Sequence, residues 1–203
     1  MKTTSLPADD LRRPLVLVDP DGPVVSHINL VGDTYTVLVS GKDTKANYCL
    51  IDMHIPSGGG PPPHRHNFEE SFTVLTGKLE VSFRDEKLVV RSGQTAQIPA
   101  NAPHQFKNGS SSSVRLLCIC APAGLEEFFA ALGTPVPSRT TSLPPPDPAL
   151  LTAAQAKAEQ LAHRFQTEFL PIDSHPNFSM HHGSLFSMGR RRACEVGLST
   201  RTF

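Results

Sequence analysis

Short runs of β-type residues, each ended by turn-forming residues, follow one another from Pro14 to Cys120. The most regular pair, Ser71–Leu75 and Lys78–Phe83, alternates apolar and polar residues on either side of Thr76-Gly77 and predicts a β-hairpin. Many short strands at close spacing predict a sandwich or barrel. The 19 prolines and 14 glycines among 203 residues suit a turn-rich all-β fold of this kind.

Further strands are expected wherever apolar and β-branched residues gather between turn signals. They are expected at residues 14–18, 24–31, 34–40, 48–55, 87–91, 104–107 and 114–120.

After Ala121 the spacing of apolar residues changes from that of a strand to that of a helix. Leu125, Phe128, Phe129 and Leu132 have the spacing of one helix face, and Gly133 provides a stop. The pattern therefore predicts a short amphipathic helix.

A second helix is expected after Asp147-Pro148, which reads as an N-cap followed by proline at the first helical position. Its apolar stripe runs from Leu151 to Phe169. This stripe is expected to dock on a barrel face or on a second subunit, so a homodimer is one candidate assembly.

The length favours one domain with one core. The expected organisation is an N-terminal arm (1–23), a barrel (24–122), a helical extension (123–170) with a proline-rich linker (134–148), and a flexible tail (171–203).

The charge balance excludes some partners. Lys and Arg together number 19, as do Asp and Glu, so nothing in the net charge favours nucleic acid or an anionic membrane. The first residues contain no secretory h-region, and no apolar run is long enough to span a bilayer. The four cysteines lack disulfide-framework or zinc-ribbon spacing. We therefore expect a cytoplasmic protein with reduced thiols and no nucleic-acid or membrane partner.

Three histidines and one glutamate form the candidate metal site. His64 and His66 are two apart, so in an extended segment both imidazoles point to the same face. Glu70 begins a strand shortly after them, and His104 comes from a later strand that a closing sheet can bring near. Such a set suits Fe(II), Mn(II), Ni(II), Cu(II) or Zn(II).

These residues occupy two motifs that resemble those of the cupin superfamily. The first motif, G-x5-H-x-H-x3,4-E-x6-G, is matched at Gly58, His64, His66, Glu70 and Gly77. The second motif, G-x5-P-x-G-x2-H-x3-N, is matched at Gly93, Pro99, His104 and Asn108.

One position departs from the second motif, because Asn101 stands where the motif has glycine. Asparagine tolerates the left-handed conformation better than most residues, so the departure is compatible with the same turn. Glu69 also precedes the first strand of the hairpin, but only Glu70 has the six-residue spacing to Gly77.

The resemblance implies a single cupin β-barrel, or jelly roll, that holds one divalent metal on His64, His66, Glu70 and His104. The chain is similar to the quercetin 2,3-dioxygenase-like group of single-domain cupins, whose fungal members often accompany secondary-metabolite enzymes. This similarity implies an oxidoreductase, with Fe(II) and O2 favoured, that acts on a small aromatic or polyketide-like molecule. Glu70 would then be the catalytic base.

Two other functions stay open at this stage. The same site could act as a Lewis acid in a non-redox isomerase, cyclase or decarboxylase. The domain could also bind a small molecule without converting it.

Three phenylalanines are candidates for the pocket wall. Phe72 and Phe106 each follow a ligand candidate by two residues, and Phe83 lies on a neighbouring strand. Core filling is the alternative role for each of them. His54 lies close before the first motif and either lines the site or is satisfied elsewhere. Cys118 and Cys120 are expected to pack in the core.

Overall fold

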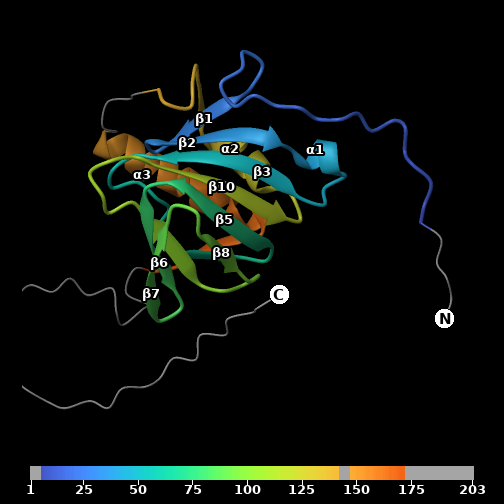
Figure 1. The fold of residues 1–203 in the computed structure, drawn as a ribbon. Coiled ribbons are helices and arrows are strands. Elements are labelled where there is room, and N and C mark those ends of the chain that lie inside the picture. Colours follow the sequence, from blue (N-terminus) through green and yellow to red (C-terminus); the bar gives the residue numbers. More distant parts are fainter. Residues whose placement is uncertain (1–5, 142–146, 172–203) are drawn as a thin grey trace, which may run out of the picture.

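Two antiparallel β-sheets form the frame of the protein in the computed structural model, which describes residues 6–141 and 147–171. The centre of the proline-rich linker and nearly all of the expected flexible tail lie outside the described residues. The first sheet has the strand order β11-β1-β2-β3-β10-β5-β8, and the second has the order β12-β4-β9-β6-β7. Figure 1 shows the strands of the first sheet from β1 to β8 side by side in this order.

Every strand pairing is antiparallel, and most strands are short. Their bounds are β1 His27–Leu30, β2 Asp33–Val39, β3 Cys49–Ile55, β4 His64–His66, β5 Glu69–Thr76, β6 Lys78–Phe83, β7 Glu86–Arg91, β8 Thr95–Ile98, β9 His104–Lys107, β10 Val114–Ala121, β11 Thr134–Val136 and β12 Thr167–Phe169.

The core lies between the two sheets. Ile51, Phe72, Val74 and Leu116 come from strands of the first sheet, Leu79 comes from the second, and all five are fully buried. Phe72, Val74, Leu79 and Leu116 are each flanked along their strands by more exposed residues, as expected for a sheet with one face on the core. The all-β fold predicted from the strand pattern is therefore confirmed, as is the jelly roll that the resemblance implied.

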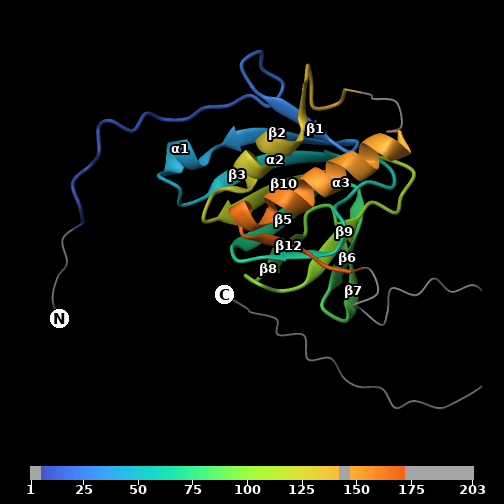
Figure 2. The ribbon, with the colours of Figure 1, turned by 180° about the vertical axis from the view of Figure 1, so that it is seen from behind.

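Helices α2 (Leu125–Leu132) and α3 (Pro148–Ala162) lie across one side of the frame, whereas the short α1 (Gly41–Thr44) lies at its end (Figure 2). As predicted, α3 begins at an aspartate N-cap, because Asp147 accepts a hydrogen bond from the backbone N–H of Ala149 at 2.7 Å. None of the described helices is long and apolar enough to cross a membrane.

The second helix ends earlier than its apolar stripe suggested. It stops at Ala162, a 3₁₀ turn follows at His163–Phe165, and Gln166 adopts a left-handed conformation with φ of 55°. The chain then forms β12, which pairs with β4 and so joins the edge of the second sheet. The prediction of one helical stripe to Phe169 was wrong because tertiary strand pairing overrides the local apolar period.

Two other differences concern sheet edges. No strand forms at residues 14–18, where Leu15 and Leu17 are each 91% exposed, since this segment finds no partner strand. Conversely, β11 lies inside the predicted linker and pairs with β1. Both additions, β11 and β12, fall outside the expected barrel range of 24–122.

Candidate metal centre

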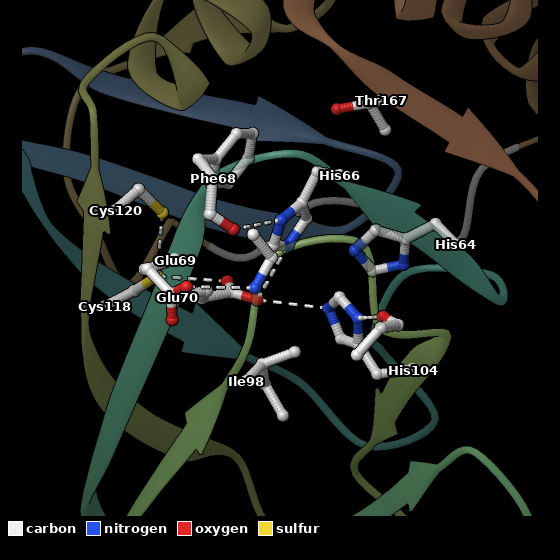
Figure 3. Close-up of polar contacts among 12 residues, drawn as sticks. His64, His66, Phe68, Glu69, Glu70, Ile98, His104, Cys118, Cys120 and Thr167 are labelled. Carbon is white, nitrogen blue, oxygen red and sulfur yellow. Dashed lines mark hydrogen bonds and ion pairs between the residues drawn. The ribbon is translucent and has the colours of Figure 1, made fainter.

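The four predicted ligands meet between the two sheets. His64 and His66 come from β4 and His104 from β9, while Glu70 comes from β5 of the other sheet. His64 and His104 are direct partners across β4 and β9, and their ring centroids are 4.2 Å apart. One ligand-type atom from each of the four residues lies within 4.8 Å of the others (Figure 3).

Backbone carbonyls set the tautomer of every histidine in the group. The Nδ1 atoms of His64, His66 and His104 each lie 2.9 Å from a backbone oxygen two residues away, belonging to Pro62, Phe68 and Ala102 respectively. A carbonyl oxygen can only accept, so each Nδ1 must carry the proton and donate it. Each neutral ring therefore presents the lone pair of Nε2 toward the shared centre, which is the arrangement usual for metal-binding histidines.

When the histidine rings are neutral, no proton or cation lies between their Nε2 atoms and the carboxylate of Glu70. The Nε2 atoms of His66 and His104 lie 3.3 and 3.1 Å from the same oxygen, Oε2 of Glu70. With Nδ1 protonated, both nitrogens and the carboxylate oxygen are acceptors, and acceptors repel one another at this distance. A divalent cation among them removes the conflict, so this donor set fits a transition-metal ion.

The second oxygen of Glu70 has its own partner. The Cys118 thiol on β10 lies 3.2 Å from Oε1 of Glu70. Contact with Cys120 lowers the pKa of Cys118, but burial and the charge of Glu70 outweigh this contact and raise it to about 12. Cys118 is therefore a thiol that donates S–H to Oε1, which orients Oε2 toward the imidazoles.

Burial acts in opposite directions on two of the ligands. It is the largest influence on Glu70 and raises its pKa. In the metal-free site, a second proton on His104 or His66 lets Nε2–H donate to Oε2, and these hydrogen bonds outweigh burial and hold the pKa of Glu70 well below its usual range. Burial and the neighbouring His104 lower the pKa of His64 to about 3. A charged carboxylate beside a neutral imidazole is the state that metal binding requires.

The motif positions outside the ligand set shape the surrounding loops. Asn101 has φ of 67°, the left-handed conformation expected where the motif has glycine, and its N–H donates to the backbone oxygen of His66 at 2.6 Å. Asn108 is fully buried, and its Nδ2 donates to the backbone oxygens of Ile55, Pro56 and Ser112. Asn101 thus ties the loop before β9 to β4, which carries two ligands, and Asn108 ties the loop after β9 to the end of β3.

Glu69 points away from the centre, as the motif spacing predicted. It is exposed, and its carboxylate accepts hydrogen bonds from the side-chain amide of Gln97 and the backbone N–H of Ala100.

A cavity of about 480 Å³ opens beside the histidines. His64, His66 and Glu70 form part of its wall. Most of the remaining wall is apolar and comes from the helices α2 and α3 and the strands β1, β3 and β12. Its apolar residues include Leu30, Met53, Leu125, Phe128, Phe129, Leu132, Leu151, Ala154 and Phe169. A volume of this size suits a small organic molecule.

The three phenylalanines proposed for the pocket have different positions. Phe106 lines the cavity. Phe72 is fully buried in the core, 5.7 Å from Phe106 between ring centroids, and Phe83 packs beneath the guanidinium of Arg84. Neither Phe72 nor Phe83 is among the residues that line the cavity, and both take the core-filling role weighed as the alternative.

His54 does not reach the cavity either. It alternates with Met53 and Ile55 on β3 and is half-buried on the outer face of the sheet, where the register places it between Thr34 and Arg115.

A buried aspartate in the cavity wall was not foreseen from the sequence. Asp33 is 4% exposed, begins β2 and lines the same cavity as the histidines. The sequence does contain an indication, because Asp33 shares the inward parity of Tyr35 on the same strand and is thus a charged residue on a core-facing position.

Comparison with known proteins identifies the fold family. The sequence model described as "Cupin domain" matches residues 51–120, which contain all four candidate ligands. The chain contains a cupin domain over these residues. The match and the described frame agree on a single cupin domain, as the two motifs predicted.

Individual relatives resemble this cupin over part of their length. Quercetin 2,3-dioxygenase of Bacillus subtilis is 29% identical over 101 residues, which cover 49% of this chain and 30% of that protein. An uncharacterized protein of Methanocaldococcus jannaschii is 30% identical over 36% of this chain and 59% of its own length. The chain therefore matches less than two thirds of either relative.

The polyketide cyclase RemF of Streptomyces resistomycificus aligns with a TM-score of 0.48 and 21% identity, covering 65% of this chain and 90% of that one.

Proposed function

We propose that this cupin is a metal-dependent oxidoreductase of the dioxygenase type, which acts on a small aromatic or polyketide-like molecule. The observation that carries the proposal is the convergence of three imidazole Nε2 atoms and one carboxylate oxygen on the wall of a largely apolar cavity.

The proposed metal ligands are His64, His66, Glu70 and His104. A bound divalent ion, with Fe(II) favoured, would supply Lewis-acid and redox chemistry toward O2. The geometry supports this assignment because the carbonyl-fixed tautomers leave every Nε2 free to bind.

Glu70 is the proposed proton acceptor for the substrate. Its Oε2 atom faces the histidines while Oε1 is held by the Cys118 thiol, so proton transfer is directed to Oε2. Removing a hydroxyl proton raises the electron density of an aromatic substrate, which favours its reaction with O2.

The apolar wall has the complementary role of orienting the substrate. Phe106, Phe128, Phe129 and Phe169 offer ring faces and edges to a planar molecule. The α3 residues on the wall, together with β12, separate this space from bulk water.

The similarity to a quercetin 2,3-dioxygenase supports the reaction type, since that protein's name describes the oxidation of a hydroxylated aromatic with O2. The matched segment is 30% of that protein, so the activity remains a proposal for this chain.

The test is oxygen uptake by protein that has been purified anaerobically and loaded with Fe(II), with quercetin and simpler phenols as probes. We expect uptake that depends on the probe, and Glu70→Gln should keep part of the metal while turnover falls by roughly 100-fold or more. Glu69→Gln, on the adjacent outward-facing glutamate, is the matched control and should retain turnover. Unchanged turnover in Glu70→Gln would exclude the base role, and product formed equally well without O2 would replace the oxidoreductase with a non-redox isomerase, cyclase or decarboxylase.

A further inference from the structure

The carboxyl group of Asp33 has one satisfied oxygen and one orphaned oxygen. Oδ2 accepts hydrogen bonds from the Tyr35 hydroxyl at 3.2 Å and from the Gly60 N–H at 3.1 Å. Oδ1 is buried and has no hydrogen-bond partner within the described part of the chain. Burying an unpaired acceptor is unfavourable by about 1–3 kcal/mol, so native proteins rarely retain one without a role.

The glycine loop before His64 packs closely against Oδ1 of Asp33. A Cβ at Gly59 would lie 2.3 Å from Oδ1 of Asp33, and it would also crowd Ile55 and Pro56 at 3.0 Å. Glycine at this position leaves room beside Oδ1 that any other residue would fill. The glycine run before His64 thus has a second purpose besides its motif position at Gly58.

Asp33 is on a different part of the wall from the candidate metal centre. In the first sheet its strand, β2, is separated from the strand of Glu70, β5, by β3 and β10. The two residues are also offset along the strands, since Glu70 lies level with Cys49 at one end of β3 and Asp33 lies near Ile55 at the other. His64 is the ligand nearer to Asp33 along the chain, because Gly60, which donates to Asp33, precedes His64 by four residues, a span of at most about 14 Å. A ligand of two or three rings that reaches the histidines at one end could therefore reach Asp33 at the other.

Charge favours a hydrogen-bond donor as the group that meets Oδ1. Among the residues that the structure describes, Asp33 has no ion pair with a lysine, arginine or histidine. Its burial raises the pKa from 3.8 to about 7, and the hydrogen bonds from Tyr35 and Gly60 only partly offset this rise. A neutral donor such as a hydroxyl group would satisfy Oδ1 without bringing a second charge into the cavity.

We propose that Asp33 is a second substrate anchor, whose Oδ1 accepts a hydrogen bond from a hydroxyl group at the end of the ligand remote from the histidines. The inference rests on the proposed function for the class of ligand, and it adds the residue that selects a hydroxyl group at that remote end. Tyr35 and Gly60 are positioning residues, because they hold Oδ2 and thereby fix where Oδ1 points.

Asp33→Asn is the most informative substitution. The hydrogen bonds donated by Tyr35 and Gly60 require an acceptor at the Oδ2 position, so the asparagine oxygen takes that place and its NH₂ group replaces Oδ1. The variant keeps the shape of the side chain but presents a donor where the native protein presents an acceptor.

The experiment measures the affinity of the metal-loaded protein for two probes by calorimetry, without oxygen and at about pH 8, above the raised pKa of about 7. The probes are quercetin and galangin, which share a ring system but differ by the two hydroxyl groups on the phenyl ring of quercetin. The native protein is expected to bind quercetin roughly fivefold more tightly or better, and Asp33→Asn should lose that preference. Asp19→Asn, at an exposed turn, should retain it.

A preference that is unchanged in Asp33→Asn would overturn the inference, as would equal affinity or no binding of both probes by the native protein. A crystal structure of the native protein with quercetin, grown anaerobically, gives a second test that needs no variant. It should place a hydroxyl oxygen within hydrogen-bonding distance of Oδ1, and a ligand that leaves Oδ1 bare would contradict the proposal. Oxygen uptake does not enter either measurement, so a failure of the oxidoreductase proposal is distinguishable from a failure of this one.

Discussion

Replacing Asp33 with asparagine should change how the stability of the protein depends on pH. The carboxyl has a pKa of 3.8 when exposed and about 7 in the fold, where burial is the dominant influence. The folded state therefore keeps a proton that the unfolded state has released, and the free energy of unfolding falls as pH rises from about 4 to about 7. Asparagine does not titrate, so Asp33→Asn lacks this decline.

The size of the effect follows from the shift in pKa. A shift of about 3 units corresponds to about 4 kcal/mol in total at about 1.4 kcal/mol per unit. About 2.5 kcal/mol of it falls between about pH 5 and about pH 8, because part of the unfolded-state titration is complete by pH 5. No discount for solvent screening is needed, since Asp33 is 4% exposed.

Urea denaturation of both proteins in metal-free form at about pH 5 and about pH 8 measures this difference. The stability of Asp33→Asn relative to the native protein should increase by about 2.5 kcal/mol over that interval. The metal ligands titrate in both proteins alike and drop out of the comparison. Parallel pH profiles for the two proteins would refute the reasoning, since they would mean that Asp33 ionises in the fold as it does in water.

Two further substitutions test the framework of the site. Cys118→Ala removes the thiol that lies 3.2 Å from Oε1 of Glu70 and should lower the free energy of unfolding by about 1–3 kcal/mol. Cys118→Ser keeps a hydrogen-bond donor and should recover most of this loss. Equal stability of the two variants in urea would argue against the S–H donor. Asn101→Ala should be destabilising by about 1 kcal/mol because alanine tolerates a φ of 67° poorly. Asn101→Gly should match the native protein in thermal unfolding, and an alanine variant more stable than the glycine variant would contradict the left-handed turn.

The predictions from sequence succeeded where residue spacing and turn chemistry act locally. The two motifs placed His64, His66, Glu70 and His104 together, and Asn101 adopted the left-handed conformation that its place in the motif required. The strands on either side of Thr76-Gly77 formed as predicted, but the predicted hairpin between them was wrong. β5 pairs with β10 and β8 of the first sheet, whereas β6 pairs with β9 and β7 of the second, so the turn passes from one sheet to the other.

The predictions failed where distant segments decide the outcome. Thr167–Phe169 became a strand because β4 offered an open edge, and residues 14–18 did not because no edge was available to them. The same limit applies to Asp33, whose burial depends on the glycine loop that packs over it from 27 residues away at Gly60. A pattern read along one strand cannot show what another part of the chain will place on top of it.

The proposed function depends on His64, His66, Glu70 and His104 binding one divalent transition-metal ion. Elemental analysis of untagged protein purified anaerobically tests this binding most directly, with His104→Ala and the exposed His163→Ala prepared in parallel. We expect about one ion per chain in the native protein and in His163→Ala, and little or none in His104→Ala. A full complement of metal in His104→Ala, or none in the native protein, would contradict it.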